Sequence, residues 1–282
     1  MAVTAQQEKA PPSQAEALYQ AQLRKERLFR THVGASWGVL FLILIFLFSG
    51  QEIKLGPIQY QTIQLDSEFI LKNLGFIAQG LGQTLLISVL SIIVAMTLAL
   101  LAALGRLSTF PPIYAVSTFY VSLIRGTPLY LQIFFFFLAL PQLGINLSGV
   151  VAGVTALGLN YGAYMSETFR AGLSSVGRGQ REAAMALGMT PGQTMKRIVL
   201  PQALRFAIPP MGNDFISMTK DSALVSATGF VHELMWRAVK VGRAQFNNLE
   251  ALIMAAMFYW MLTLILTYFQ GKLEARLARG DR

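Results

Sequence analysis

Residues 76–104 decide the class of fold, because they read FIAQGLGQTLLISVLSIIVAMTLALLAAL without a single Asp, Glu, Lys or Arg. A helix needs about 20 mainly apolar residues to cross roughly 30 Å of hydrocarbon, and this run is longer than that. The whole chain has the same character, since 54% of its 282 residues are hydrophobic and only 13% are charged. Soluble domains carry about 25% charged residues. The sequence therefore predicts an integral membrane protein.

Further apolar runs extend this interpretation to an all-α membrane fold of about six transmembrane helices. The other runs are 34–48, 113–140, 150–175, 203–228 and 249–271. The first run resembles a secretion signal, but a long polar segment precedes it and no small-x-small cleavage site follows, so we interpret it as an uncleaved anchor. Residues 15–30 lack Gly and Pro and predict a short surface helix before it.

Glycines lie inside or beside the apolar runs. Small residues allow helices to approach closely in lipid, so these positions predict helix contacts. They are Gly80, Gly82, Gly105, Gly126, Gly153 and Gly158.

The distribution of basic residues predicts the orientation. With the N-terminus inside, fourteen of the 23 Lys and Arg residues fall in cytoplasmic segments. Five fall in outer segments: Lys54, Lys72, Arg237, Lys240 and Arg243. Because cytoplasmic loops are enriched in basic residues, both termini are expected to be cytoplasmic, and the net charge of +9 needs no nucleic acid to explain it.

Several kinds of chemistry are excluded by composition. The chain has no cysteine and only two histidines, His32 and His232, so we expect no metal site and no cofactor. No G-x-x-x-x-G-K-[ST] phosphate loop occurs, so the chain does not hydrolyse ATP by that route, and we expect no enzymatic activity.

One cytoplasmic loop is longer than a connection requires. Residues 173–202 read LSSVGRGQREAAMALGMTPGQTMKRIVLPQ. Helix formers run from Glu182 to Leu187, Gly188 ends them, and Thr190-Pro191 is typical of a new helix start. The loop predicts a short helix–turn–helix at the membrane surface, with Ala183 and Ala184 as a narrow apolar ridge that fits a groove on a partner.

The loop also carries a specific motif. Glu182-Ala183-Ala184, Gly188, Ile198 and Leu200-Pro201 match every fixed position of EAA-x3-G-x9-I-x-L-P. This pattern resembles the signature of ABC importer permeases, in which the loop is the coupling helix that docks on the ATP-binding subunit. Glu182 can offer a charge-assisted hydrogen bond to a basic group of that partner.

Other segments narrow the resemblance to the polar amino acid uptake (histidine/glutamine-type) permeases, over about residues 75 to 275. The matching positions are Arg125-Gly126-Thr127-Pro128-Leu129, Ala163-Tyr164, Glu167, Arg170, Gly172, Gly179-Gln180, Pro209, Asn213, Lys220-Asp221-Ser222, Leu224 and Glu233-Leu234. The family core has five spans, so the helix after residue 33 is an extra element.

The resemblance implies a domain organisation. It consists of a cytoplasmic tail at 1–33, an extra helix and outer loop at 34–75, an ABC importer transmembrane domain at 76–272 and a cytoplasmic tail at 273–282.

The resemblance also implies a location and partners. The chain is expected in the cytoplasmic (inner) membrane of a prokaryote as a multi-pass protein in contact with lipid. Its expected partners are two ATP-binding subunits, an identical or related second permease and an extracytoplasmic amino acid-binding protein. Two such permeases would form a translocation pathway that works by alternating access.

Charged residues inside the spans are the candidates for a substrate pathway, since they face a cavity or a partner. Asp214, beside Asn213, is the deepest carboxylate, and Pro209, Pro210 and Gly212 favour a break in its helix. Asp214 could contact a substrate ammonium, or it could pair with Arg125 or Lys220 and hold helices together.

Three further charged residues belong to this group of candidates. Arg125 precedes a kink at Gly126-Thr127-Pro128 and is a candidate for packing or for a substrate carboxylate. Lys220 lies near the outer end of its span, where it could belong to an outer gate or to an interface with the binding protein, or be an ordinary charge at a helix end. Glu167 pairs by default with Arg170 on one helix face.

A gradient-driven secondary transporter is the alternative function. Such carriers commonly show internal inverted repeats, and none is evident in this sequence.

Overall fold

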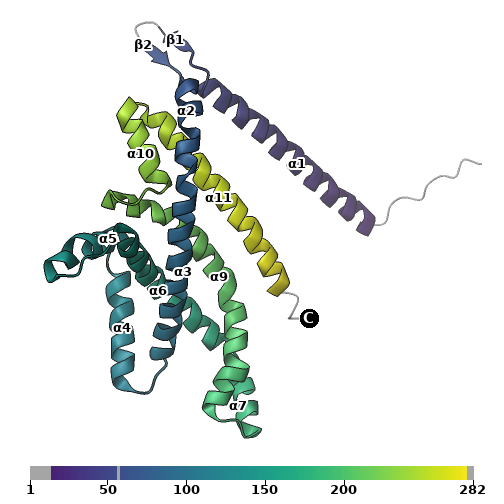
Figure 1. Cartoon of the computed structure of the whole chain (residues 1–282). Coiled ribbons are helices and arrows are strands. Elements are labelled where there is room, and N and C mark those ends of the chain that lie inside the picture. The colour runs from purple at the N-terminus through teal and green to yellow at the C-terminus, as the bar shows by residue number, and fades with distance from the viewer. Residues whose placement is uncertain (1–13, 56–57, 278–282) are drawn as a thin grey trace, which may run out of the picture. The chain divides into compact units, whose positions relative to one another are not determined.

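A computed structural model describes residues 14–55 and 58–277 of the protein (Figure 1). It divides into two compact units, Met1–Leu65 and Asp66–Arg282, which we describe separately. Residues 1–13 of the expected N-terminal tail and 278–282 of the expected C-terminal tail lie outside the described residues.

The first unit consists of one long helix and a hairpin. Helix α1 (Gln14–Leu47) is continuous, so the separate surface helix expected at 15–30 is the beginning of the same helix as the anchor. No proline separates the two parts, and an internal glycine such as Gly34 costs only about 1 kcal/mol relative to alanine. After α1, β1 (Glu52–Leu55) pairs antiparallel with β2 (Ile58–Gln61). The fold is therefore mostly helical and not purely α.

Helices are the regular secondary structure of the second unit in residues 66–277. In chain order it contains α2 (Ser67–Ala78), α3 (Gly80–Gly105), α4 (Pro111–Arg125), α5 (Leu129–Phe134), α6 (Gly149–Ser175), α7 (Arg178–Ala186), α8 (Pro191–Thr194), α9 (Leu200–Asp221), α10 (Leu234–Gln245) and α11 (Asn248–Leu277). A π-helical turn (Phe135–Ala139) and a 3-10 turn (Leu140–Leu143) follow α5. A second π-helical turn (Met195–Val199) precedes α9, and a 3-10 turn (Ser222–Thr228) follows it.

Three helical runs of the described residues are long and apolar enough to cross a membrane: Leu18–Leu47, Ser67–Gly105 and Asn248–Leu277. A fourth candidate is a broken pair, Pro111–Arg125 with Leu129–Leu143, whose two parts meet at 106°. Helices α6 and α9 coincide with the other two predicted spans but are more polar, because glycine and polar side chains line their contacts. Their membrane crossing stays a prediction.

Helices α3 and α6 form the centre of the second unit. Ala95, Ala99 and Ala103 of α3 are fully buried in the main hydrophobic cluster. A Cβ added to Gly158 of α6 would lie 2.6 Å from Cγ1 of Val94. Because lipid provides no hydrophobic force between helices, this close approach through small residues supplies the packing energy. The expected role of Gly158 as a contact position is confirmed.

A second, smaller cluster joins α2, α10 and the start of α11. Glu233 caps α10, is fully buried, and accepts hydrogen bonds from the backbone N–H groups of Met235 (2.9 Å) and Trp236 (2.7 Å). The hydroxyl of Tyr259 on α11 donates to the same carboxylate at 2.5 Å. Burial has the larger effect and raises the pKa of the Glu233 carboxyl above its usual value, although these hydrogen bonds partly lower it. The Glu233 carboxylate therefore connects α10 to α11 through hydrogen bonds.

Helix α9 is uninterrupted, although Pro209 and Pro210 lie inside it. The expected break is therefore wrong. A proline leaves the carbonyl four residues earlier without its helical donor, here at Arg205 and Phe206. Both of these residues are exposed and line a cavity, so the freed carbonyls do not need to find partners in packed protein. The chain breaks instead between α4 and α5, as the Gly126-Thr127-Pro128 segment predicts.

The α3–α6 contact generates the first testable prediction. Gly158→Ala should lower the stability of the detergent-purified protein by about 1–3 kcal/mol, because its methyl group overlaps Val94. Thermal unfolding of the purified protein measures this change. Gly82→Ala in α3 is the matched control, because no atom lies within 4 Å of its added Cβ. Equal melting temperatures for the two variants would contradict the packing account.

Candidate functional site

The loop at residues 173–202, which we call the coupling loop after the role that its motif predicts, has the helix–turn–helix form expected from the sequence. Helix α7 (Arg178–Ala186) ends before Gly188, whose φ of +79° suits glycine and few other residues. Thr190 then caps α8 through a reciprocal capping box with Gln193, and Pro191 occupies the first turn. The predicted turn at Gly188 and the predicted helix start at Thr190-Pro191 are confirmed, whereas α7 begins four residues before Glu182 and α8 ends at Thr194, where a π-helical turn follows. Figure 1 shows α7 at the opposite end of the second unit from α10, at the end where α3 turns into α4.

The exposed surface of the coupling loop differs in one respect from the expected ridge. Glu182 and Ala183 are exposed, but Ala184 is only 4% exposed because α7 packs against α8 and the turn that follows it. The outward apolar surface includes Ala183, Met185 and Leu187, and Leu187 is 84% exposed. An apolar side chain as exposed as Leu187 is suited to a partner groove.

Residues beside the motif attach the loop to the helical core. Ile198 and Leu200 are half-buried, and Pro201 is exposed in the first turn of α9. The amide of Gln202 donates to Oε1 of Gln180 at 2.6 Å, which joins the start of α7 to α9. A guanidinium nitrogen of Arg181 donates to the carbonyl of Leu173 at the end of α6. The coupling loop is therefore attached to both α6 and α9.

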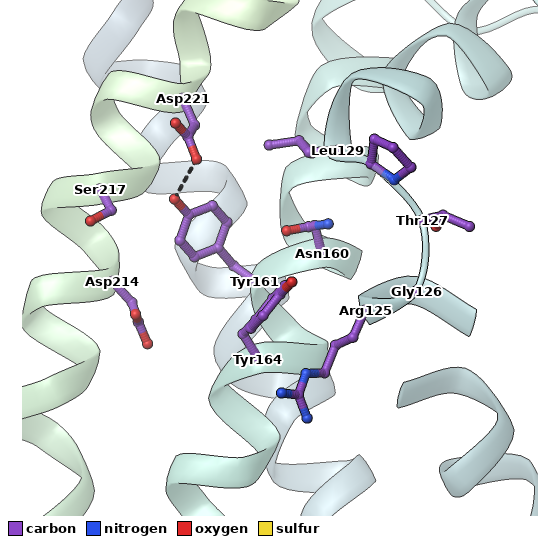
Figure 2. A pocket seen from close by; sticks show the side chains of 11 residues that line it. Arg125, Gly126, Thr127, Leu129, Asn160, Tyr161, Tyr164, Asp214, Ser217 and Asp221 are labelled. Carbon is purple, nitrogen blue, oxygen red and sulfur yellow. Dashed lines mark hydrogen bonds between the residues drawn. The ribbon is translucent and has the colours of Figure 1, made fainter. Parts of the chain in front are cut away.

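A cavity of about 590 Å³ opens between the α4–α5 break, α6 and α9 (Figure 2). Its lining comprises Arg125, Gly126, Thr127, Pro128, Leu129, Asn160, Tyr161, Tyr164, Asp214, Ser217 and Asp221. Arg125 and Asp214 enter it from opposite sides, with Tyr161 and Tyr164 between them. The hydroxyl of Tyr161 donates to Oδ2 of Asp221 at 2.7 Å. The cavity therefore presents one guanidinium and two carboxylates to a small polar molecule.

The structure brings together some of the predicted pathway residues and separates others. Arg125 and Asp214 line the cavity, whereas Asn213 and Lys220 are exposed on α9 outside its lining. Glu167 lies behind the cavity on α6, where it forms ion pairs with Arg125 and with Arg170, the partner expected from their spacing. Within the described residues Asp214 makes no ion pair, so the alternative of a pair with Arg125 or Lys220 is not observed.

The residue that holds the α4–α5 break, Gln132, is not among the predicted site residues. Gln132 is buried, and its Nε2 donates to the carbonyls of Ile124 (2.9 Å) and Thr127 (3.1 Å). Its Oε1 accepts from Nδ2 of Asn160 at 3.2 Å. These contacts satisfy carbonyls that the bend removes from a regular helix and fix them to the cavity wall. A glutamine in an apolar run is the only signal that could have pointed to it.

The family of the chain is shown by comparison with known proteins. Residues 95–279 match the family described as "Binding-protein-dependent transport system inner membrane component". The chain belongs to this family. It is the membrane-spanning permease subunit of a binding-protein-dependent transport system, and it is an integral protein of the inner membrane.

Similar proteins are permeases for amino acids. The permease is 41% identical over 220 residues to the arginine transport system permease protein ArtQ of Bacillus subtilis, covering 78% of this chain and all of that protein. It is 41% identical over 201 residues to the L-cystine transport system permease protein TcyB of the same organism, covering 71% of this chain and 86% of that protein.

Solved structures agree with this assignment. The permease matches the crystal structure of an amino acid ABC transporter with histidines, at 35% identity and a TM-score of 0.71, over 76% of this chain and 99% of that chain. It also shares the fold of an inward-facing MetNI methionine ABC transporter, at 15% identity and a TM-score of 0.60, over 76% of this chain and 99% of that chain. The expected resemblance to ABC importer permeases is confirmed, and a gradient-driven carrier is not favoured.

The hydrogen bonds of Gln132 give a prediction for the permease. Gln132→Leu should destabilise it by about 0.5–1.5 kcal/mol for each hydrogen bond that is lost, and should deform the cavity wall. Thermal unfolding in detergent measures the loss. Gln83→Leu on α3 is the control, because no hydrogen bond joins the Gln83 side chain to the described residues. An unchanged melting temperature for Gln132→Leu would show that the bend does not depend on this side chain.

Proposed function

We propose that this permease carries polar amino acids through the cavity between α4, α6 and α9, driven by ATP hydrolysis on a separate subunit. The observation that supports the substrate class is the arrangement of charges around the cavity. A free amino acid carries a carboxylate and an ammonium group, and the cavity offers Arg125 on one side with Asp214 and Asp221 on the other. A guanidinium suits a carboxylate because it donates two parallel hydrogen bonds.

The two carboxylates of the cavity have different surroundings. Asp221 already accepts a hydrogen bond from Tyr161, whereas Asp214 makes no hydrogen bond or ion pair within the described residues. Asp214 is therefore the better partner for the ammonium group of a substrate. This contact would compensate a carboxylate that is otherwise unpaired in a half-buried position.

Coupling to ATP hydrolysis is proposed to pass through the loop formed by α7 and α8. The family membership implies an ATP-binding subunit and a substrate-binding protein as partners. We propose two copies of the ATP-binding subunit and a second permease, identical or related. Glu182, Ala183, Met185 and Leu187 supply an exposed surface with one charge and three apolar side chains that fits a groove on the ATP-binding subunit.

The proposed topology follows from the position of this loop. If α7 meets the ATP-binding subunit in the cytoplasm, then α10 and the α2 end of the second unit face outward, where a binding protein delivers the substrate (Figure 1). Both termini are then cytoplasmic, with six membrane crossings, of which α6 and α9 are two. Binding of nucleotide and of the loaded binding protein would shift the pathway between its inward-open and outward-open states.

The coupling role predicts the behaviour of Glu182→Lys. The variant should insert into the membrane at the wild-type level but co-purify with much less ATP-binding subunit, because a like charge then faces the basic partner group. Quantitative mass spectrometry of the tagged permease measures the ratio of the two subunits. Glu68→Lys makes the same exposed charge change on α2, at the other end of the unit, and should retain the partner. Wild-type partner recovery with Glu182→Lys would reject the coupling assignment.

The pathway role predicts the behaviour of Asp214→Asn. Loss of a charge-assisted hydrogen bond worth about 1.5–3 kcal/mol should weaken amino acid binding by about tenfold or more, with partner recovery unchanged. Binding of radiolabelled amino acid to the purified permease–ATPase complex measures the affinity. Ser217→Ala, which also lines the cavity on α9, should change it less than about threefold. If both variants bind like the wild type, the cavity is not the substrate site.

A further inference from the structure

Three arginines converge on one carboxylate behind the cavity. Glu167 of α6 accepts hydrogen bonds from Arg106, which follows α3, from Arg125, the last residue of α4, and from Arg170 on its own helix. These three are the ion pairs found within residues 14–55 and 58–277, so one negative charge serves three positive charges. The cluster therefore carries an excess of positive charge that a second anion could balance.

The three contacts differ in length and surroundings. Arg106 approaches Oε1 most closely and has the least exposed side chain of the three, at 22%. Arg170 holds Oε2 at 2.8 Å across one turn of α6. Arg125 reaches Oε1 only at 3.4 Å, and its side chain is 42% exposed. A contact of that length is a weak hydrogen bond, so Arg125 is the arginine most easily released from Glu167.

Arg125 is also the arginine of the cluster that lines the cavity. Its guanidinium carbon lies 5.1 Å from the centre of the Tyr164 ring, and that ring is part of the cavity wall (Figure 2). Glu167 lies three residues beyond Tyr164 on α6 and does not belong to the lining. The guanidinium of Arg125 therefore contacts the resident carboxylate and also lines the space where a substrate carboxylate would arrive.

We propose that Glu167 is a positioning residue that competes with the substrate carboxylate for Arg125. In the empty cavity Glu167 holds the guanidinium in place. The carboxylate of an arriving amino acid then pairs with the Arg125 guanidinium in place of Glu167, which stays paired with Arg106 and Arg170. When the amino acid leaves toward the cytoplasm, Glu167 recovers Arg125. The inference rests on the proposed function, because it assumes that the cavity binds an amino acid.

The exchange has a mechanical consequence. Arg125 ends α4, directly before the Gly126-Thr127-Pro128 break, so its contact with Glu167 ties the end of α4 to α6. Substrate binding removes this tie directly beside the bend between α4 and α5. A substrate shifts a conformational equilibrium only through contacts that differ between the two states, and the exchanged ion pair is such a contact.

Two substitutions should change substrate affinity in opposite directions. Glu167→Gln removes the competing charge and should tighten binding of L-arginine by about two- to fivefold, as expected for a partly exposed ion pair. It should also slow uptake at saturating substrate, because the recovery of Arg125 is impaired. Arg106→Gln removes the closest partner of Glu167, which then holds Arg125 more firmly, and should weaken L-arginine binding by a similar factor.

The experiment uses the purified permease–ATPase complex without its binding protein. Scintillation proximity measures the affinity for radiolabelled L-arginine and for agmatine, the same molecule without its carboxylate, and proteoliposomes measure the uptake rate. Agmatine should bind no tighter to Glu167→Gln than to the wild type, because it does not compete for Arg125. The inference is overturned if Glu167→Gln increases the affinity for both probes, or if it slows uptake while the L-arginine affinity stays unchanged. Either result would indicate a purely structural role for Glu167.

Arg125→Ala separates this inference from the proposed function. If Arg125→Ala leaves L-arginine affinity unchanged, the cavity does not bind the carboxylate, and both the site and the competition are wrong. If Arg125→Ala weakens L-arginine but not agmatine, while Glu167→Gln and Arg106→Gln both match the wild type, the site stands and only the competition is wrong.

Discussion

The close packing of α6 against α3 is the contact on which the rest of the second unit depends. Gly158 and Gly162 bring α6 to within van der Waals distance of Val94, Leu98 and the Ala95 carbonyl on α3. In lipid such contacts replace the hydrophobic force that assembles soluble helices. One side of α6 is thereby fixed, and its other faces become available for the cavity, for α9 and for the charged cluster. Asn160, Tyr161 and Tyr164 reach the cavity from this fixed helix.

The same helix connects the cavity to the coupling loop. Glu167 lies between the tyrosines of the cavity and the end of α6 at Ser175, and α7 begins only three residues further on. The contact of Arg181 with the Leu173 carbonyl, and that of Gln180 with Gln202, attach the loop to α6 and α9 at once. A displacement of α7 by a partner is therefore transmitted to two of the three elements that enclose the cavity. If the loop docks on the ATP-binding subunit as proposed, this arrangement gives a physical route between ATP hydrolysis and substrate passage.

The sequence predicted the features that local patterns control. The apolar runs locate the long helices to within a few residues, apart from the earlier starts of α1 and α2 and the later end of α11. Gly188 and Thr190-Pro191 locate the turn between the two short helices of the coupling loop, because caps and left-handed turns depend on single residue types. The hairpin β1–β2 and the continuity of α9 through Pro209 and Pro210 were not predicted. A proline is a strong local signal for a break, but its cost depends on whether the freed carbonyls face packed protein or open space.

The features that could not be predicted depend on contacts between residues that are far apart in the sequence. Gln132 with Ile124 and Asn160, Tyr259 with Glu233, and Arg106 with Glu167 each join separate helices, and no spacing in the sequence relates their positions. The local pair of Glu167 with Arg170 was expected, whereas its pairs with Arg106 and Arg125 are seen only in the structure. Sequence reasoning thus named Arg125, Asp214 and Glu167 as candidates, and the structure shows which of them share a cavity.

The most direct test of the account is uptake by proteoliposomes that contain the permease with its ATP-binding subunit, supplied externally with its binding protein and a radiolabelled amino acid. With ATP available to the ATP-binding subunit, the amino acid should accumulate against its gradient and continue to do so after ionophores have dissipated proton and sodium gradients. Accumulation that requires an ion gradient and proceeds equally well without ATP would contradict the account.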